Sequence, residues 1–212
     1  MRITAITAQQ RQPNRVNIYV DGAYRFSLDI YQLTDLGIKV GAEYSKQELV
    51  ALEEESVYGK LYARALEYTM LRPHSAKEIR DYLWRKTRTT KVRNQKTGEI
   101  RERPGVSQAV ADRVYERLVE KGYIDDEKFS RYWVENRSLR KGVSRRKLEQ
   151  ELMSKGVPRS TIESSLSVTE RNDIEELHKV IAKKRARYPD EQKFIAYLLR
   201  QGFGYDDIKD NL

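Results

Sequence analysis

The feature that most constrains the fold is a short pattern that recurs three times along the chain. Its copies are Ser75-Ala76-Lys77-Glu78-Ile79 with Leu83, Ser144-Arg145-Arg146-Lys147-Leu148 with Leu152, and Asp190-Glu191-Gln192-Lys193-Phe194 with Leu198. Each copy combines a residue that favours a helix N-cap with apolar residues four positions apart. A short helix with a single apolar stripe needs neighbouring helices to bury that stripe. The recurrence therefore predicts tandem helical repeats.

Helical spacing also flanks the copies. Phe129 and Trp133 precede the second copy four positions apart, and Ile162 and Leu166 come after it. We therefore predict a mainly α fold, with three tandem three-helix repeats in an elongated array. The predicted repeats cover residues 51–122, 123–168 and 169–212.

A different periodicity near the N-terminus predicts a β-hairpin. Apolar residues alternate on both sides of Asp21-Gly22, with Val16, Ile18 and Val20 before it and Tyr24, Phe26 and Leu28 after it. Asp and Gly both tolerate the positive φ that a two-residue hairpin turn requires. We expect residues 1–50 to form this hairpin and a short helix, as a small unit that packs on the next part of the chain.

The first repeat carries an extra segment, residues 87–106 (TRTTKVRNQKTGEIRERPGV). The segment is polar, and its halves are compatible with strands on either side of Lys96-Thr97-Gly98. We predict a β-hairpin that projects from the first repeat, because so few apolar residues cannot belong to a core.

Composition argues for a binding protein over an enzyme. The chain has no Cys and two His, so thiolate metal sites, disulfides and Cys nucleophiles are excluded. Neither a phosphate-binding loop motif nor a dinucleotide fingerprint is present. No apolar stretch approaches the roughly 18 residues of a membrane span, so we expect a cytoplasmic protein without membrane contact. We also expect a monomer that holds no metal or cofactor.

The net charge of +9 is concentrated in two segments, because residues 87–106 and 125–167 hold seven of the nine excess positive charges. In the predicted inserted hairpin we expect the cations to bind a partner: Lys91, Arg93, Lys96, Arg101 and Arg103. The second group falls within eleven residues that contain no acid: Arg137, Arg140, Lys141, Arg145, Arg146 and Lys147. Backbone amides at the Ser144 cap are expected to add to its attraction for phosphate or carboxylate.

Two other features have a structural and a functional interpretation. Trp84 and Trp133 could stack on nucleic-acid bases, but their apolar neighbours favour packing in the core. The run Asp125-Asp126-Glu127 could serve a metal-dependent nuclease, but acids at the start of a helix usually cap it. We expect the structural role in both cases.

The chain resembles the RecX family of regulatory proteins. The first set of matching residues is Ala65-Leu66, Leu71-Arg72-Pro73-His74-Ser75, Glu78-Ile79 and Leu83. The second set is Gly122-Tyr123-Ile124-Asp125-Asp126, Phe129, Arg137, Gly142, Leu148, Glu151-Leu152 and Lys155-Gly156-Val157. The hairpin at residues 16–28 also resembles the N-terminal extension of longer members.

The resemblance implies a non-enzymatic regulator that binds in the groove of the RecA recombinase filament on single-stranded DNA. Such a protein restrains ATP hydrolysis and strand exchange, and acts in recombination, DNA repair and the SOS response. By matching position, Arg72, Arg137 and Lys155 become candidate contacts with the filament, and single- or double-stranded DNA is a further candidate partner. The alternative is a tandem helix-turn-helix-like nucleic-acid-binding protein that acts without RecA.

Overall fold

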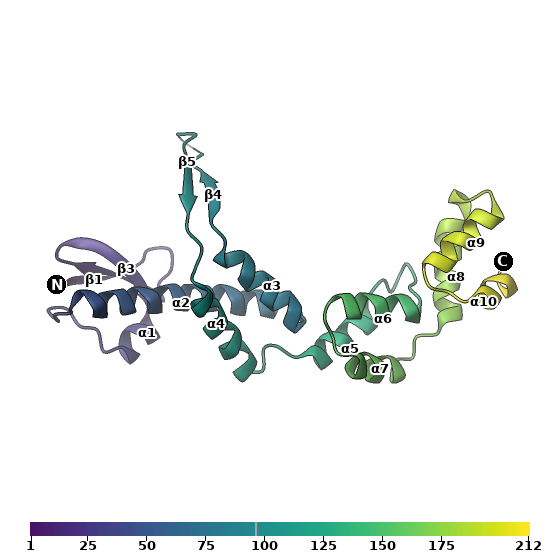
Figure 1. Cartoon of the computed structure of the whole chain (residues 1–212), viewed down its shortest axis with the longest axis horizontal. Helices are drawn as coiled ribbons and strands as arrows, with labels where there is room; N and C mark the ends of the chain where they lie inside the picture. Colours follow the sequence, from purple (N-terminus) through teal and green to yellow (C-terminus); the bar gives the residue numbers. More distant parts are fainter. Residues whose placement is uncertain (96) are drawn as a thin grey trace. The chain divides into compact units, whose positions relative to one another are not determined.

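The computed structural model describes residues 1–95 and 97–212, and it is mainly helical with a small N-terminal sheet (Figure 1). The first part of the chain forms β1 Ile3–Ala8, β2 Arg15–Val20, β3 Ala23–Asp29, α1 Ile30–Asp35, α2 Lys46–Leu71, α3 Ala76–Thr87, β4 Thr90–Arg93, β5 Ile100–Arg103 and α4 Gln108–Glu120. The second part forms α5 Asp126–Asn136, α6 Arg145–Ser154, α7 Arg159–Ser167, α8 Asp173–Lys184, the short 3-10 helix η1 Arg185–Arg187, α9 Glu191–Arg200 and α10 Tyr205–Asp210. The predicted fold class is confirmed.

The chain divides into two compact units. The first holds residues 1–71 and 80–123, and the second holds residues 72–79 and 124–212. Residues 72–79, which include the first turn of α3, thus belong with the helices from α5 onward. The division into four domains made from the sequence stays a prediction.

The N-terminal sheet is antiparallel, in the order β1-β2-β3. Asp21 and Gly22 form the turn with φ of +49° and +84°, and Val20 lies opposite Ala23. One face of the sheet is buried in a cluster that includes Ile18 of β2 and Leu49 of α2. The helix α2 therefore begins in the core of the sheet and continues without a break across residue 50.

The inserted segment forms the predicted hairpin, which projects away from α3 and α4 (Figure 1). In its antiparallel pair, Thr90 lies opposite Arg103 and Arg93 lies opposite Ile100. Every residue of β4 and β5 is exposed. At its base, Val106 N donates to the carbonyl oxygen of Lys86 at 3.0 Å. Lys96, in the predicted turn, lies outside the described residues.

The second unit contains two three-helix clusters, each built around one of the recurring patterns. Phe129 of α5, Leu148 of α6 and Ile162 of α7 are fully buried in one cluster. Leu177 of α8 and Phe194 of α9 are fully buried in the other. Apolar residues at helical spacing therefore form the cores that the sequence predicts.

The predicted helix caps are present. Ser144 accepts a hydrogen bond from Lys147 N at 3.1 Å, and Asp190 accepts one from Lys193 N at 3.1 Å. Asp125 caps α5 by accepting from the backbone amides of Glu127 and Lys128. The acidic run at the start of α5 thus contributes to capping, as expected from helix-end chemistry.

In the second unit, equivalent hydrogen bonds join the first turns of α3 and α6 to the first helix of the three-helix cluster that follows each of them. The first amide of α3, Ala76 N, donates to Asp126 Oδ1 at 2.8 Å. The first amide of α6, Arg145 N, donates to Asp173 Oδ1 at 2.7 Å. In both cases the acceptor carboxylate belongs to the first residue of the following three-helix cluster. The recurring pattern therefore specifies a recurring junction as well as a helix.

Candidate partner and nucleic-acid interface

The hairpin β4–β5 carries exposed cations with few internal partners. Lys91, Arg93 and Arg103 are exposed and form no ion pair within the described residues. Arg101 pairs with Glu99 at 2.9 Å, but both side chains are more than half exposed, and such pairs contribute little. These cations are therefore available to a partner, together with the exposed Val92 and Ile100.

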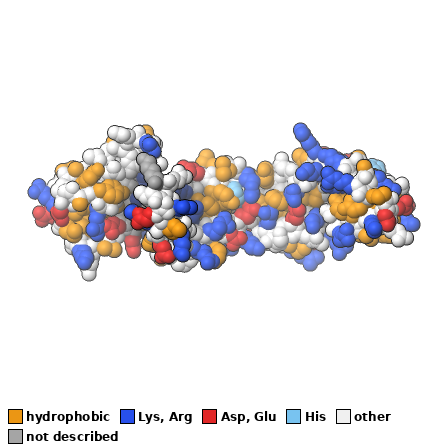
Figure 2. Space-filling view, turned by 90° about the horizontal axis from the view of Figure 1, so that it is seen from above, with side chains coloured by type: hydrophobic (Ala, Val, Ile, Leu, Met, Phe, Trp, Pro, Cys, Tyr) orange, Lys and Arg blue, Asp and Glu red, His pale blue; other side chains and the backbone are white. Residues whose placement is uncertain are grey.

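The cations just before α6 and in its first turn are of two kinds, those without an internal partner and those that bind within the chain. Arg140, Lys141 and Arg146 are exposed and form no ion pair in the described part of the chain. Arg145 Nη1 instead donates to the carbonyl oxygen of Leu166 at 2.8 Å. On the face shown in Figure 2, Lys and Arg side chains lie in separate groups with Asp and Glu side chains between them.

The start of α6 does not offer the amides that the sequence led us to expect for an anion. Arg145 N donates to Asp173 Oδ1, and Val143 N donates to Glu176 Oε2 at 2.9 Å. Carboxylates of the chain itself therefore occupy the positions expected for phosphate. This expectation is wrong, because the cap serves the junction with α8.

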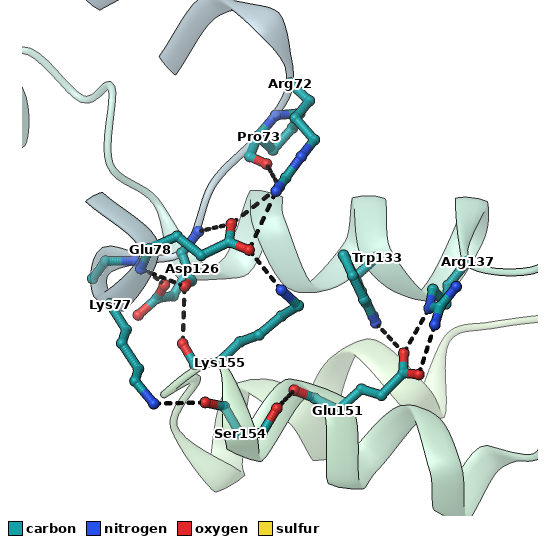
Figure 3. Close-up of polar contacts among 12 residues, drawn as sticks. Arg72, Pro73, Lys77, Glu78, Asp126, Trp133, Arg137, Glu151, Ser154 and Lys155 are labelled. Carbon is teal, nitrogen blue, oxygen red and sulfur yellow. Dashed lines mark hydrogen bonds and ion pairs between the residues drawn. The ribbon is translucent and has the colours of Figure 1, made fainter. Parts of the chain in front are cut away.

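Arg72, Arg137 and Lys155 lie in a network of internal contacts (Figure 3). Glu78 accepts from Arg72 Nη1 at 3.0 Å and from Lys155 Nζ at 2.6 Å. Burial alone would raise the pKa of Glu78, but the hydrogen bonds from Arg72 and Lys155 outweigh it and lower that pKa. Lys155 thus holds the first turn of α3 to the end of α6, while Arg72 holds the segment just before α3 to the same carboxylate.

A second carboxylate organises the other end of this network. Glu151 accepts from Arg137 Nε at 2.7 Å and from Trp133 Nε1 at 3.0 Å. Lys155 Nζ lies 4.3 Å from the centre of the Trp133 ring, on which it makes a cation–π contact. The hydrogen bond that Arg137 donates to Glu151 also raises the pKa of Arg137. In this conformation the functional groups of Arg72, Arg137 and Lys155 are all engaged inside the chain.

A further cationic surface was missed by the sequence analysis. A hollow of about 700 Å³ lies between the β1–β2 loop and α2, and its lining includes Arg15, Lys60 and Arg64. Burial lowers the pKa of Lys60, and the positive charges of Arg15, Arg64 and Arg103 lower it further. Residues 1–50 and 51–86 each carry an excess of a single positive charge. Counting charge along the chain could not reveal a cluster that only folding assembles.

The tryptophans differ from the expectation that both pack in the core. Trp133 packs against the buried cluster of α5, α6 and α7, so the expectation is confirmed for it. Trp84 of α3 is 53% exposed, so the expectation is wrong there. Its neighbour Leu83 fills the buried position of that helix turn and leaves the indole at the surface.

Comparisons with known proteins find similarity to one family of regulatory proteins. Residues 1–44 match the model of the regulatory protein RecX N-terminal domain, and residues 125–166 match that of the RecX second three-helix domain. Relatives called regulatory protein RecX include one from Bacillus licheniformis, 27% identical over 97% of this chain and 74% of its own, and one from Clostridium tetani, 26% identical over 98% and 91%. The chain is thus similar to RecX regulatory proteins over nearly its whole length.

The fold of the chain also matches a solved structure. A crystal structure of a regulatory protein RecX covers 99% of this chain and 98% of its own, with a TM-score of 0.67 and 24% identity. The network around Glu151 falls inside the matched segment 125–166, whereas the hairpin β4–β5 lies outside both matched segments. The two family models thus say nothing about the hairpin.

Two further observations concern metal ligands and membrane spans among the described residues. They include no group of three or more His, Cys, Asp or Glu side chains placed to bind a metal ion. None of their helices combines the length and apolar character needed to cross a membrane.

Proposed function

We propose that this protein is a RecX-type regulator that binds the RecA filament on single-stranded DNA and inhibits its ATP hydrolysis and strand exchange, without catalysing a reaction itself. Its similarity to regulatory RecX proteins supports a regulatory role. The proposed binding surface rests on the exposed cations that form no ion pair among the described residues: Lys91, Arg93, Arg103, Arg140, Lys141 and Arg146. These cations would contact DNA phosphates or acidic groups of the recombinase.

The proposed mechanism is a shift of population. A protein that binds one state of the filament more tightly than another favours that state by the difference in binding free energy. Separate weak contacts from the hairpin and from the segment before α6 reinforce each other, because linking them raises the effective concentration of the second contact. Exposed cations suit this use, since they meet their partner without losing an internal ion pair.

Arg72, Arg137 and Lys155 have a different part in this proposal. They position the helices, because each is bound to Glu78 or Glu151. Replacing them would reduce inhibition through loss of stability, whereas replacing Arg140, Lys141 and Arg146 would reduce it without loss of stability. The two groups can thus be separated by measuring unfolding and inhibition on the same variants.

The test is the ATPase activity of RecA on single-stranded DNA, measured with and without this protein. We expect the rate to fall as the protein is added. The triple charge reversal Arg140→Glu, Lys141→Glu and Arg146→Glu should weaken the inhibition. The control reversal Lys183→Glu, Lys184→Glu and Arg187→Glu changes the net charge equally at another site and should leave it intact. An ATPase rate that does not respond to the wild-type protein rejects the proposal.

A nucleic-acid-binding function without RecA is the second candidate. Two helix pairs favour it: α6 and α7 are joined by residues 155–158, and α9 and α10 by residues 201–204. Short connections that contain Gly are typical of helix-turn-helix motifs. Affinity for duplex DNA that falls steeply with salt, with no effect on the ATPase of RecA, would favour this candidate.

A further inference from the structure

The first compact unit contains a groove between α3 and α4 whose volume is about 520 Å³. Its floor includes the buried side chains of Leu83 and Ala111, and Trp84 and Tyr115 stand among its walls. The indole of Trp84 is 53% exposed although an apolar floor lies beside it. The groove thus offers an aromatic surface large enough for a planar ligand.

Cations accompany both aromatic rings of this groove. The Arg80 guanidinium lies 4.6 Å from the centre of the Tyr115 ring, and the Arg88 guanidinium lies 4.8 Å from the centre of the Trp84 ring. Both arginines are exposed and form no ion pair within the described residues. Arg88 also immediately precedes the basic hairpin, so a ligand that stacks on Trp84 would have further positive charge next to it.

The acids of the groove determine which part of a ligand it accepts. Asp81 and Asp112 line it, and Gln108 Nε2 donates to Asp112 Oδ1 at 2.8 Å. Carboxylates repel a phosphate group but accept hydrogen bonds from the amino groups of bases. The groove itself therefore suits a base, whereas Arg80, Arg88 and the hairpin suit the phosphates on either side of that base.

We propose that the groove between α3 and α4 binds an unstacked base of single-stranded nucleic acid, which stacks on Trp84 while its flanking phosphates contact Arg80, Arg88 and the hairpin. Aromatic platforms beside basic surfaces bind single strands in this way in other proteins. An acidic protein segment is a poorer occupant, because Asp81 and Asp112 would repel its side chains. This binding does not require the recombinase.

The test is a fluorescence titration of the whole protein with oligodeoxycytidylate, in the absence of RecA. The chain has two tryptophans, and Trp133 is held by Glu151. We expect the oligonucleotide to quench Trp84, and Trp84→Phe to abolish the quenching while an anisotropy measurement with a labelled oligonucleotide still detects binding. Trp84→Ala should weaken the affinity by about 5-fold to about 100-fold, as stacking contacts do elsewhere.

Tyr205→Ala is the matched control. Tyr205 is 52% exposed and has Lys209 Nζ 5.9 Å from its ring centre, but it lies outside the groove. This variant should bind like the wild type, and circular dichroism should show the same helicity for all variants. Unchanged affinity of Trp84→Ala, absence of binding by the wild type, or quenching of Trp84 by polyglutamate but not by the oligonucleotide would each overturn the proposal. Since RecA is absent, such a failure leaves the ATPase test unaffected.

Discussion

Ser144 Oγ donates a hydrogen bond of 2.6 Å to the backbone carbonyl oxygen of Gln201, the C-cap residue of α9. Ser75 Oγ donates in the same way to the carbonyl oxygen of Lys155, the C-cap residue of α6, at 2.8 Å. Each hydroxyl also accepts a hydrogen bond from an amide of its own helix. One small side chain thus caps a helix and joins it to the next central helix. Asp190, in the third copy, caps α9 by accepting from Lys193 N, but a carboxylate has no hydrogen to donate to a further helix.

Replacement of Ser144 should therefore cost more than the loss of a cap. Ser144→Ala removes the cap of α6 and leaves the carbonyl of Gln201 without its donor. Loss of a cap alone costs about 0.5 to 2 kcal/mol, and loss of the part-buried hydrogen bond to Gln201 costs about 0.5 to 1.5 kcal/mol more. Urea denaturation measures the change in free energy of unfolding.

Ser107→Ala is the control for the cap alone. Ser107 accepts from Val110 N at 3.3 Å at the start of α4 and is exposed. We expect it to destabilise the protein clearly less than Ser144→Ala. Equal effects of the two replacements would contradict a role of Ser144 in the junction.

The same junction should be sensitive to added volume at Gly202. This glycine has φ of +92°, and a Cβ atom there would lie 2.6 Å from Ser144 Oγ. Gly122 has φ of +70° with nothing within 4 Å of its Cβ position, so Gly122→Ala measures the backbone strain alone. Gly202→Ala should be more destabilising than Gly122→Ala by about 1 to 3 kcal/mol, the usual cost of overpacking. Equal urea midpoints of unfolding for Gly202→Ala and Gly122→Ala would contradict this prediction, because the junction would then accommodate the added methyl group.

Stability should decline in acid because of two ion-paired carboxylates, the buried Glu176 and the partly buried Glu78. Burial alone would raise the pKa of Glu176, but hydrogen bonds from Arg171, Lys179 and Val143 N outweigh it and lower that pKa, as Arg72 and Lys155 do for Glu78. A carboxyl whose pKa is lower in the folded state contributes its full stability above its unfolded pKa. That contribution is lost as the pH falls below the ordinary Glu value of 4.5, through the lowered pKa of the folded state.

Glu176→Gln isolates this contribution. Asp173 acts in the opposite sense, since burial raises its pKa. The free energy of unfolding, measured from about pH 7 to about pH 3, should fall less steeply for Glu176→Gln than for the wild type. At neutral pH the variant should already be less stable, because Arg171, whose side chain is 12% exposed, loses its charged partner. Parallel curves for the two proteins would contradict the assignment.

Charge reversal in the hairpin should affect binding alone. Replacing Lys91, Arg93, Arg101 and Arg103 by Glu changes no buried side chain. We expect weaker association with RecA filaments, measured by co-sedimentation, and unchanged helicity by circular dichroism. Wild-type association of this variant would exclude a role for the hairpin, and the reversal of Lys183, Lys184 and Arg187 serves as its control.

The sequence was informative where the deciding interactions are local. The turn at Asp21-Gly22 is explained by the φ values that these residues tolerate, and the caps at Ser144 and Asp190 by hydrogen bonds within three residues. Apolar spacing then identified Phe129 and Phe194 as core residues, because a helix places such positions on one face. These features need no knowledge of distant segments.

The roles of the cations were decided by tertiary structure. Sequence grouped Arg137 with Arg140, but only the fold places Glu151 against Arg137 and leaves Arg140 exposed. Lys155 binds Glu78, which lies 77 residues away in the sequence, and no local sequence pattern indicates that contact. The sequence thus determined the elements, their caps and their repetition, because these depend on neighbours along the chain. Tertiary structure decided which charges are used internally and which stay exposed, because ion pairs depend on neighbours in space.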